Sequence, residues 1–234
     1  MDQLVFSRSF TLDRSRSAAA QVYDFLREEI VNMQLKPGAE LSRNELAAHF
    51  ALSITPVRDA LMRLEEDGLV DVFPQHATRV RGISIDSARQ AHFLRLALEL
   101  EIVRTLAQQN DPAVNQALKL WVTHQRLASE HGDLKGFTDA DQNFHRAMYK
   151  AANAEELWHL IRARSGNMDR LRRLHLPLNG KAEAILQDHG DIAEAIARGD
   201  GAGAQDIVRR HLSGTLSVLD SLREQFPGYW VPER

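Results

Sequence analysis

The hydrophobic period of the chain changes twice, and these changes limit the folds open to it. Apolar residues recur at helical spacing up to Gly68, and residues 69–73 and 78–81 then alternate between apolar and polar. From Asp86 onward the helical spacing returns and nothing resembles a strand. A period near 3.6 predicts amphipathic helices, and a period of two predicts strands. We therefore expect two short strands, joined as a hairpin through residues 74–77, in an otherwise helical chain.

Three helices are expected before the hairpin. The first runs from about residue 17 to 34 and ends before Pro37, because proline cannot continue a helix. Ser42 caps the second with the Ser-x-x-Glu spacing of a capping box. Pro56 fits the first turn of the third, which ends at Gly68. Three short helices followed by a β-hairpin is the element order of a winged helix-turn-helix, with the hairpin as its wing.

The rest of the chain predicts an all-α antiparallel helical bundle, so the expected fold class is mostly α. Helical periodicity is carried by residues 86–109, 111–130, 134–152, 154–178, 180–198 and 202–225. The expected organisation is a flexible leader (1–13), a winged helix-turn-helix domain (14–82), a linker (83–86), an all-helical domain (87–225) and a tail (226–234).

Composition narrows the functions open to this chain. No apolar stretch approaches the roughly 20 residues of a membrane span, and no signal peptide precedes the first helix, so we expect a cytoplasmic protein that does not bind membranes. The chain has no cysteine, so a metal site would need histidine and carboxylate ligands. Residues 1–82 hold 10 Lys+Arg against 12 Asp+Glu, a net charge of −2, so DNA binding is argued from the positions of arginines and not from net charge.

Two parts of the sequence resemble known families. The run LSITPVRDALMRLEEDGLV at 52–70 closely resembles the recognition helix of the GntR family of bacterial regulators. The run DQNFHRAMY at 141–149, the segment from His189 to Asp200, and His211 resemble the FCD ligand-binding domain of the FadR branch. Together the resemblances extend from about residue 17 over almost the whole chain. They imply a ligand-controlled transcription factor, usually a repressor, that binds operator DNA as a homodimer.

Two positions depart from the family pattern. Ile54 stands where an arginine that contacts DNA is common, and Ala77 stands where the wing tip commonly has glycine. Both departures concern the preferred operator sequence, not the fold. Loss of a cation at Ile54 should shift DNA contacts onto neighbouring side chains.

The third helix is the expected DNA-reading element, because a helix fits the major groove with its N-terminal residues nearest the base edges. Arg58 is the candidate for a bidentate contact to guanine, and Thr55 shares its exposed face. The start of the preceding helix and the wing offer further cations for phosphate and the minor groove. The candidate DNA contacts are Arg43, Ser53, Thr55, Arg58, His76 and Arg79.

A metal site is expected in the bundle. Asp141 and His145 are four residues apart, so both side chains project from one face of a helix. His189 and His211 lie on the last two helices, and all four positions match the family motif. Three imidazoles and one carboxylate suit a divalent ion, Zn²⁺ foremost, with Ni²⁺, Co²⁺ and Mn²⁺ as alternatives.

The resemblance also implies that Arg95 and Glu99 face a ligand cavity. A metal ion and a guanidinium in one pocket form a receptor for a carboxylate, so the expected effector is a small organic acid, a sugar acid, or a fatty or amino acid derivative. Alternatively, Arg95 pairs with Glu99 on a solvated face. Arg162, Arg164 and Asn167 are further candidates for the pocket wall.

Two other functions remain open at this point. A metal-dependent hydrolase or isomerase could be housed in the bundle, but four protein ligands leave less room than the three usual at catalytic zinc. No arrangement in the sequence supplies an evident general base, and an enzyme has no use for a recognition helix, so we do not expect an enzyme. The other possibility is a DNA-binding regulator whose metal is purely structural.

Overall fold

The computed structural model describes residues 6, 9–73, 78–178 and 180–232. Its contacts divide the chain into two compact units, which are described separately. The head unit comprises Met1–Ala88, Arg164–Leu174 and Asp220–Arg234, and the bundle unit comprises Arg89–Ala163 and His175–Leu219.

The elements of the head unit are α1 (Ala18–Val31), β1 (Glu40–Leu41), α2 (Arg43–Phe50), α3 (Ile54–Glu66), β2 (Val70–Val72), β3 (Thr78–Val80), α8 (Gly166–His175), α11 (Leu219–Gln225) and η2 (Pro227–Tyr229). Those of the bundle unit are α4 (Ile85–Gln109), α5 (Pro112–Glu130), α6 (Leu134–Ala151), α7 (Glu155–Arg164), α9 (Lys181–Ala197), α10 (Gly201–Ser213) and η1 (Leu216–Val218).

The head unit contains a small antiparallel sheet in the order β1-β3-β2. The two predicted strands pair with Val70 opposite Val80, and a third strand, β1, adds Glu40 opposite Arg79. The sequence did not predict β1, because two residues are too few to display a period of two. The wing-tip predictions for His76 and Ala77 lie outside the described residues. The fold class is confirmed as mostly helical, with a winged helix-turn-helix followed by an all-helical domain.

Local signals in the sequence set the helix starts of the head. The Oγ atom of Ser42 accepts a hydrogen bond from the backbone N–H of Glu45 at 3.3 Å, which confirms the predicted cap of α2. Ser53 precedes α3 without a side-chain capping bond. Between these two helices Ala51 adopts a left-handed conformation, with φ of 51°, and turns the chain from α2 into α3.

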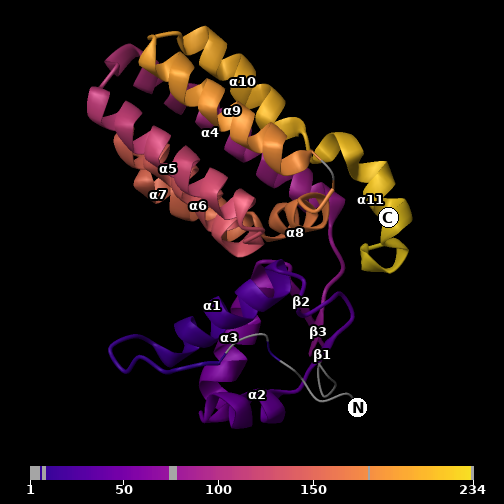
Figure 1. Ribbon diagram of the computed structural model, residues 1–234. Helices are drawn as coiled ribbons and strands as arrows, with labels where there is room; N and C mark the ends of the chain where they lie inside the picture. The colour runs from indigo at the N-terminus through magenta and orange to yellow at the C-terminus, as the bar shows by residue number, and fades with distance from the viewer. Residues whose placement is uncertain (1–5, 7–8, 74–77, 179, 233–234) are drawn as a thin grey trace. The chain divides into compact units, whose positions relative to one another are not determined.

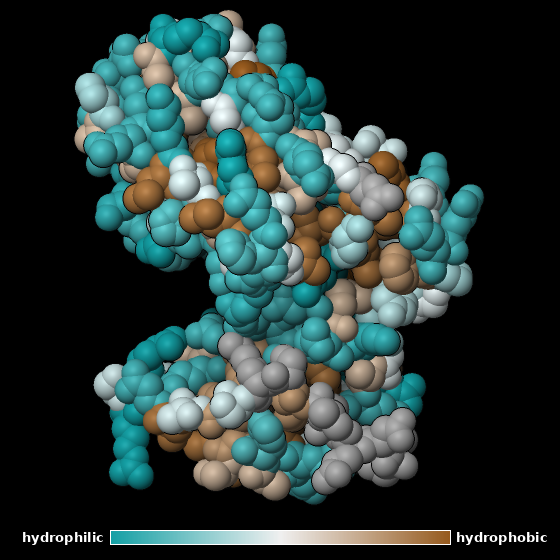
Figure 2. Space-filling view, viewed as in Figure 1, coloured by the Kyte–Doolittle hydropathy of each residue, from teal (hydrophilic) through white to brown (hydrophobic). Residues whose placement is uncertain are grey.

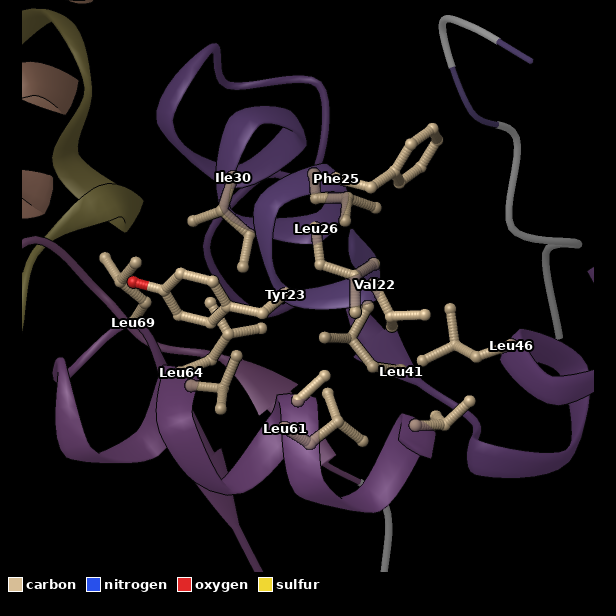
Figure 3. Close-up of a cluster of buried hydrophobic side chains, with 14 of the residues drawn as sticks. Val22, Tyr23, Phe25, Leu26, Ile30, Leu41, Leu46, Leu61, Leu64 and Leu69 are labelled. Carbon is tan, nitrogen blue, oxygen red and sulfur yellow. The ribbon is translucent and has the colours of Figure 1, made fainter. Parts of the chain in front are cut away.

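The core of the head is formed mainly by α1 and α3. Figure 3 shows Val22, Leu26 and Ile30 of α1 gathered with Leu61 and Leu64 of α3. All five side chains are essentially inaccessible to solvent. Burying a side chain of this size stabilises a fold by about 1.5–3 kcal/mol, so the apolar stripe of α3 fixes which of its faces remains exposed.

Aromatic rings extend this core toward the start of the chain. Phe10 lies in the segment for which the sequence favours a flexible leader. Its ring contacts those of Phe25 and Phe50, with the ring centroids of Phe10 and Phe50 4.7 Å apart. Phe6 lies against the same two rings.

Two of the predicted long helices are interrupted. The stretch 154–178 forms α7 and α8, which are separated at Ser165, and the stretch 202–225 forms α10, η1 and α11. At the first break the carbonyl oxygen of Ser165 accepts from the N–H of Asp169, and its hydroxyl donates to the Asp169 carboxylate at 2.6 Å, so a new helix starts there. Gly166 follows, and a Cβ at this position would lie 2.8 Å from a methyl carbon of Leu69.

Residues 81–83, which follow the wing, contact helix α8 and the C-terminal segment. Arg170 of α8 donates to the carbonyl oxygens of Arg81 at 2.6 Å and Gly82 at 3.2 Å. Ile83 forms a parallel bridge with Trp230. A Cβ on Gly82 would lie 2.7 Å from the carbonyl carbon of Trp230, so only glycine permits this approach of the two backbones.

The bundle unit has its own core. In Figure 1 α5 lies along α6, and α9 lies along α10, and the contacts agree. The buried side chains that fill it include Val103, Leu106, Phe144, Met148 and Ile192. No helix among the described residues is both long and apolar enough to cross a membrane, and the face in Figure 2 is mostly hydrophilic, with hydrophobic residues gathered in patches.

Candidate metal centre and DNA-binding surface

Three helices of the bundle unit bring the four predicted metal ligands together. Asp141 and His145 come from α6, His189 from α9 and His211 from α10. One oxygen or nitrogen from each of these residues lies within 4.8 Å of those from the other three. His145 and His189 are completely buried. The fold therefore assembles a cluster consistent with a metal site from residues up to 70 positions apart in the sequence.

The imidazoles converge through their Nε2 atoms. The Nε2 atom of His211 lies 3.2 Å from that of His189 and 3.3 Å from that of His145. The nearest carboxylate oxygen of Asp141 is 3.6 Å from the Nε2 atom of His189. Three nitrogens and one oxygen around a common point are the donor set that a tetrahedral divalent ion binds.

The second nitrogen of each ring faces an acceptor. The Nδ1 atom of His145 lies 3.0 Å from Glu99, that of His189 lies 2.7 Å from the side-chain oxygen of Gln125, and that of His211 lies 3.5 Å from Asp188. An imidazole that donates from Nδ1 keeps its lone pair on Nε2. Three lone pairs aimed at one another repel unless a cation lies between them, so these residues fit a metal ion, which would supply a Lewis-acid site for an oxygen ligand.

The protonation states of the clustered residues also favour a metal ion at this site. Burial disfavours the imidazolium form and, helped by the charge of Arg95, lowers the pKa of His145 to about 4. Burial, with the neighbouring His211, also lowers the pKa of His189 well below its ordinary value. Burial works to raise the pKa of Asp141, but electrostatic interactions with the imidazoles, His145 first, and with Arg95 lower it overall. At neutral pH these three residues therefore present free lone pairs.

Arg95 and Glu99 lie beside the cluster in α4. The Nε atom of Arg95 donates to Glu99 at 2.6 Å, and only 8% of Arg95 and none of Glu99 is exposed. The pair that the sequence allowed on a solvated face is therefore a buried pair. The Nη2 atom of Arg95 and the hydroxyl of Tyr149 are both buried and have no hydrogen-bond partner among the described residues.

The other predicted pocket residues lie elsewhere. The guanidinium of Arg162 stands over the ring of Trp158, 5.8 Å from its centroid. Arg164 is exposed at the end of α7. Asn167 belongs to the head unit, where its side-chain oxygen accepts from the N–H of Ser84 at 2.9 Å and from Arg170 at 2.7 Å. An effector-binding role for these residues stays a prediction.

Sequence reasoning missed three residues near the cluster. Gln125 and Asp188 lie next to histidine nitrogens only in the folded chain. Asp188 could have been suspected only because it precedes His189 in the sequence. Tyr149 lies four residues after His145, on the same face of α6, which was a usable signal. No spacing in the sequence indicates Gln125.

In the head unit α3 presents the surface expected to meet DNA. Its buried stripe is Val57, Ala60, Leu61 and Leu64. Ser53, Thr55 and Arg58 are exposed, together with the apolar side chains of Ile54 and Met62. The side chain of Arg58 is 58% exposed, and its ion-pair partner among the described residues is Asp59, at 3.4 Å. This face is open to a partner.

The two other described arginines proposed to contact DNA differ in their surroundings. Arg43 is the first residue of α2 and is half-buried. Arg79 of β3 is paired with Glu40 of β1, with an Nη2 to carboxylate distance of 2.5 Å. Both members of this pair are about half exposed, so solvent screens the interaction and a phosphate could compete for Arg79.

Fold and site together define a class. A winged helix-turn-helix with an exposed, arginine-bearing third helix, joined to a helical domain with a buried cluster of potential metal ligands, describes a two-domain transcriptional regulator. The model of the family described as bacterial regulatory proteins, gntR family, matches residues 18–80, and that of the FCD domain matches residues 90–214. The chain belongs to the GntR family and carries an FCD domain, as the resemblance implied. This is a family of regulators and not of enzymes, so the hydrolase or isomerase alternative is excluded.

Individual proteins of similar sequence are also described as transcriptional regulators. The chain is 33% identical over 212 residues to an HTH-type transcriptional regulator of Streptomyces ambofaciens, covering 91% of this chain and 89% of the relative. It is 29% identical to the HTH-type transcriptional repressor RspR of Escherichia coli K12, covering 95% and 97%. Among solved structures it resembles E. coli McbR/YncC, with a TM-score of 0.74 and 25% identity over 90% of this chain and 99% of that one.

Proposed function

We propose that this protein is a repressor whose binding to double-stranded operator DNA is controlled by a small carboxylate bound beside a divalent metal ion. The observation that carries the proposal is the convergence of three imidazole nitrogens and one carboxylate oxygen within 4.8 Å, in a domain joined to a DNA-binding head. Zn²⁺ is the favoured ion, because it prefers four-coordinate sites of nitrogen and oxygen.

The DNA-binding part of the proposal rests on the exposed face of α3. Arg58 can offer two parallel N–H donors to a guanine, since among the described residues its charged contact is an exposed one with Asp59. Ser53 and Thr55 lie at the start of the same helix and would contact phosphate or base. Arg43 and Arg79, with His76 at the wing, would add contacts to phosphate and the minor groove.

The effector part rests on donors that remain unused beside the metal ligands. The Nη2 atom of Arg95 is buried without a partner among the described residues, and so is the hydroxyl of Tyr149. A buried donor without an acceptor costs about 1–3 kcal/mol, which a ligand oxygen would recover. A carboxylate that reached the metal ion with one oxygen and Arg95 with the other would satisfy such a site. Organic acids and sugar acids have this chemistry.

The repressor and homodimer assignments belong to the same proposal and rest on named relatives and on the way helix-turn-helix proteins read DNA. RspR is described as a transcriptional repressor, and so is the probable regulator of a D-xylose utilization operon from Paenarthrobacter nicotinovorans, which is 29% identical to this chain. Helix-turn-helix proteins read two half-sites through two copies of the recognition helix. A dimer would also strengthen DNA binding, because residues 1–82 carry a net charge of −2 and attract phosphate only weakly.

A second candidate is a regulator with a purely structural metal. The complete burial of His145 and His189 favours it, because a structural ion is closed off by its protein ligands. In that case the ion would raise stability without making the protein responsive to any acid.

A thermal-shift screen separates the two candidates. The zinc-loaded protein is heated with a panel of small carboxylates, and the screen is repeated after chelation and with Arg95→Met. We expect one acid to raise the melting temperature only when zinc is bound and Arg95 is present, and the same acid to weaken binding to a cognate operator. Stabilisation by zinc with no response to any acid would favour the structural metal and contradict the effector proposal.

A further inference from the structure

Gln125 stands out among the groups around the four ligands, because it is the only uncharged residue of the three that face the second nitrogens. It comes from α5, is completely buried, and its side-chain oxygen lies 2.7 Å from the Nδ1 atom of His189. The corresponding groups for His145 and His211 are the carboxylates of Glu99 and Asp188.

The three contacts differ in what they impose on the rings. A carboxylate only accepts hydrogen bonds, so Glu99 and Asp188 favour the tautomer of His145 and His211 that carries its proton on Nδ1. An amide both donates and accepts. With its oxygen toward His189, Gln125 selects the same tautomer, whereas with its nitrogen toward the ring it would force the proton onto Nε2, where a metal ion must bind.

Among the described residues, the contact with His189 is the one hydrogen bond that the Gln125 side chain makes. The Nε2 atom of Gln125 is buried and has no hydrogen-bond partner among the described residues. The contact with the imidazole is therefore the interaction that orients the amide. The imidazole ring is itself stacked on the ring of Phe144, with the ring centroids 4.1 Å apart. Ring and amide together form a unit that can hold the His189 lone pair toward the other ligands.

We propose that Gln125 is a positioning residue of the metal centre, which holds His189 in the tautomer whose Nε2 atom is free to bind the ion. The inference rests on the metal site proposed above. It deepens that proposal by assigning a determinant of metal affinity to a residue on a fourth helix, α5, that itself contributes no ligand. Groups that orient metal-binding histidines in this way commonly change affinity by 10–100-fold when they are removed.

The test compares two substitutions of Gln125 with opposite hydrogen-bonding character. Gln125→Leu shortens the side chain by one atom and can neither donate nor accept, and Gln125→Glu keeps the length and supplies an obligate acceptor. Gln205→Leu is the matched control, because Gln205 is a partly buried glutamine of the same unit that donates to the carbonyl oxygen of Leu100, away from the histidines. Zinc content is measured by elemental analysis and zinc affinity by competition with a chromophoric chelator.

We expect Gln125→Leu to weaken zinc binding about 10–100-fold, and Gln125→Glu and Gln205→Leu to stay within about threefold of the wild type. In the zinc-loaded wild type, two-bond ¹⁵N–¹H spectra should show the proton of His189 on Nδ1. Circular dichroism of the chelated variants shows whether each still folds.

The outcomes distinguish the two proposals. Wild-type protein that takes up no zinc would refute the metal site itself. Wild-type protein that binds one zinc ion per chain, together with Gln125→Leu of equal affinity, would leave the metal site standing and overturn the role of Gln125. Equal losses in Gln125→Leu and Gln125→Glu would also overturn it, because the acceptor would then not be what matters.

Discussion

At the scale of single residues, neighbouring side chains determine how readily the arginines of the head unit can contact DNA. Arg58 is mostly exposed, and its contact with Asp59 is between exposed groups, which is worth little in water. Arg79 is held by Glu40 on the adjacent strand. A base edge or phosphate can therefore engage Arg58 without first breaking a strong interaction, whereas Arg79 must exchange one partner for another. This difference makes Arg58 the sharper test of DNA recognition.

We predict that Arg58→Ala weakens specific operator binding. A bidentate contact to guanine contributes about 1–3 kcal/mol, so affinity should fall by about 5- to 150-fold while non-specific binding changes little. The measurement is a fluorescence anisotropy titration with cognate and scrambled duplexes at one fixed salt concentration. Arg126→Ala, an exposed arginine on α5, is the control for loss of one positive charge. Normal operator affinity in Arg58→Ala would mean that α3 reads DNA through other residues.

The candidate metal ligands could be predicted from the sequence, but the residue that contacts His189 from another helix could not. The i,i+4 spacing of Asp141 and His145 was visible directly, and the positions of His189 and His211 followed from the resemblance. Gln125 was not predictable, because it approaches His189 from 64 positions away and its contact depends on how α5 packs. Periodicity places a side chain on a face of a helix but does not say which side chain of another helix it meets.

At the scale of elements, α8 is unusual because it buries an arginine that has no carboxylate partner within the described part of the chain. Arg170 is completely buried, and burial, together with the charge of Arg81, lowers its pKa to about 10, which still leaves it charged at neutral pH. Its hydrogen bonds go to Asn167 and to the backbone of residues 81 and 82. Continuous helical periodicity over 154–178 concealed this element, because the break at Ser165 depends on contacts with Asp169 and Leu69. β1 was concealed by its length.

We predict that Arg170→Met destabilises the protein by about 1–3 kcal/mol. The change relieves the cost of a buried charge, but it removes the donor to two backbone carbonyl oxygens and one of the two hydrogen bonds that the Asn167 side-chain oxygen accepts. The second effect should prevail. Unfolding in urea measures the difference. Arg173→Met, on the same helix but partly exposed, should change the free energy of unfolding by no more than about 0.5 kcal/mol. An Arg170→Met protein as stable as the wild type would show that the hydrogen bonds to residues 81 and 82 contribute nothing net.

At the scale of the whole molecule, the chain has two separate hydrophobic cores, one in each unit. The candidate metal ligands lie wholly within the bundle unit, whereas α3 and the sheet lie wholly within the head unit. Sequence periodicity predicted a head and a bundle. It did not predict that residues 164–174, which fall inside the range matched by the FCD model, form their contacts with the head. That grouping arises from tertiary contacts of Arg170, Asn167 and Gly166, none of which has a signature in the sequence.

This separation predicts where a bound metal will stabilise the protein. A ligand present at about 1,000 times its dissociation constant stabilises the form that binds it by about 4 kcal/mol. Because all four ligands come from α6, α9 and α10, zinc should slow amide hydrogen exchange in peptides from these helices and leave peptides from α1 and α3 nearly unchanged. Hydrogen-exchange mass spectrometry of chelated and zinc-loaded protein measures this. The variant His189→Ala/His211→Ala should show no zinc-dependent protection, and both substituted residues belong to the bundle unit. Protection of equal size in both units, or its persistence in the double variant, would place the ion somewhere other than among these four residues.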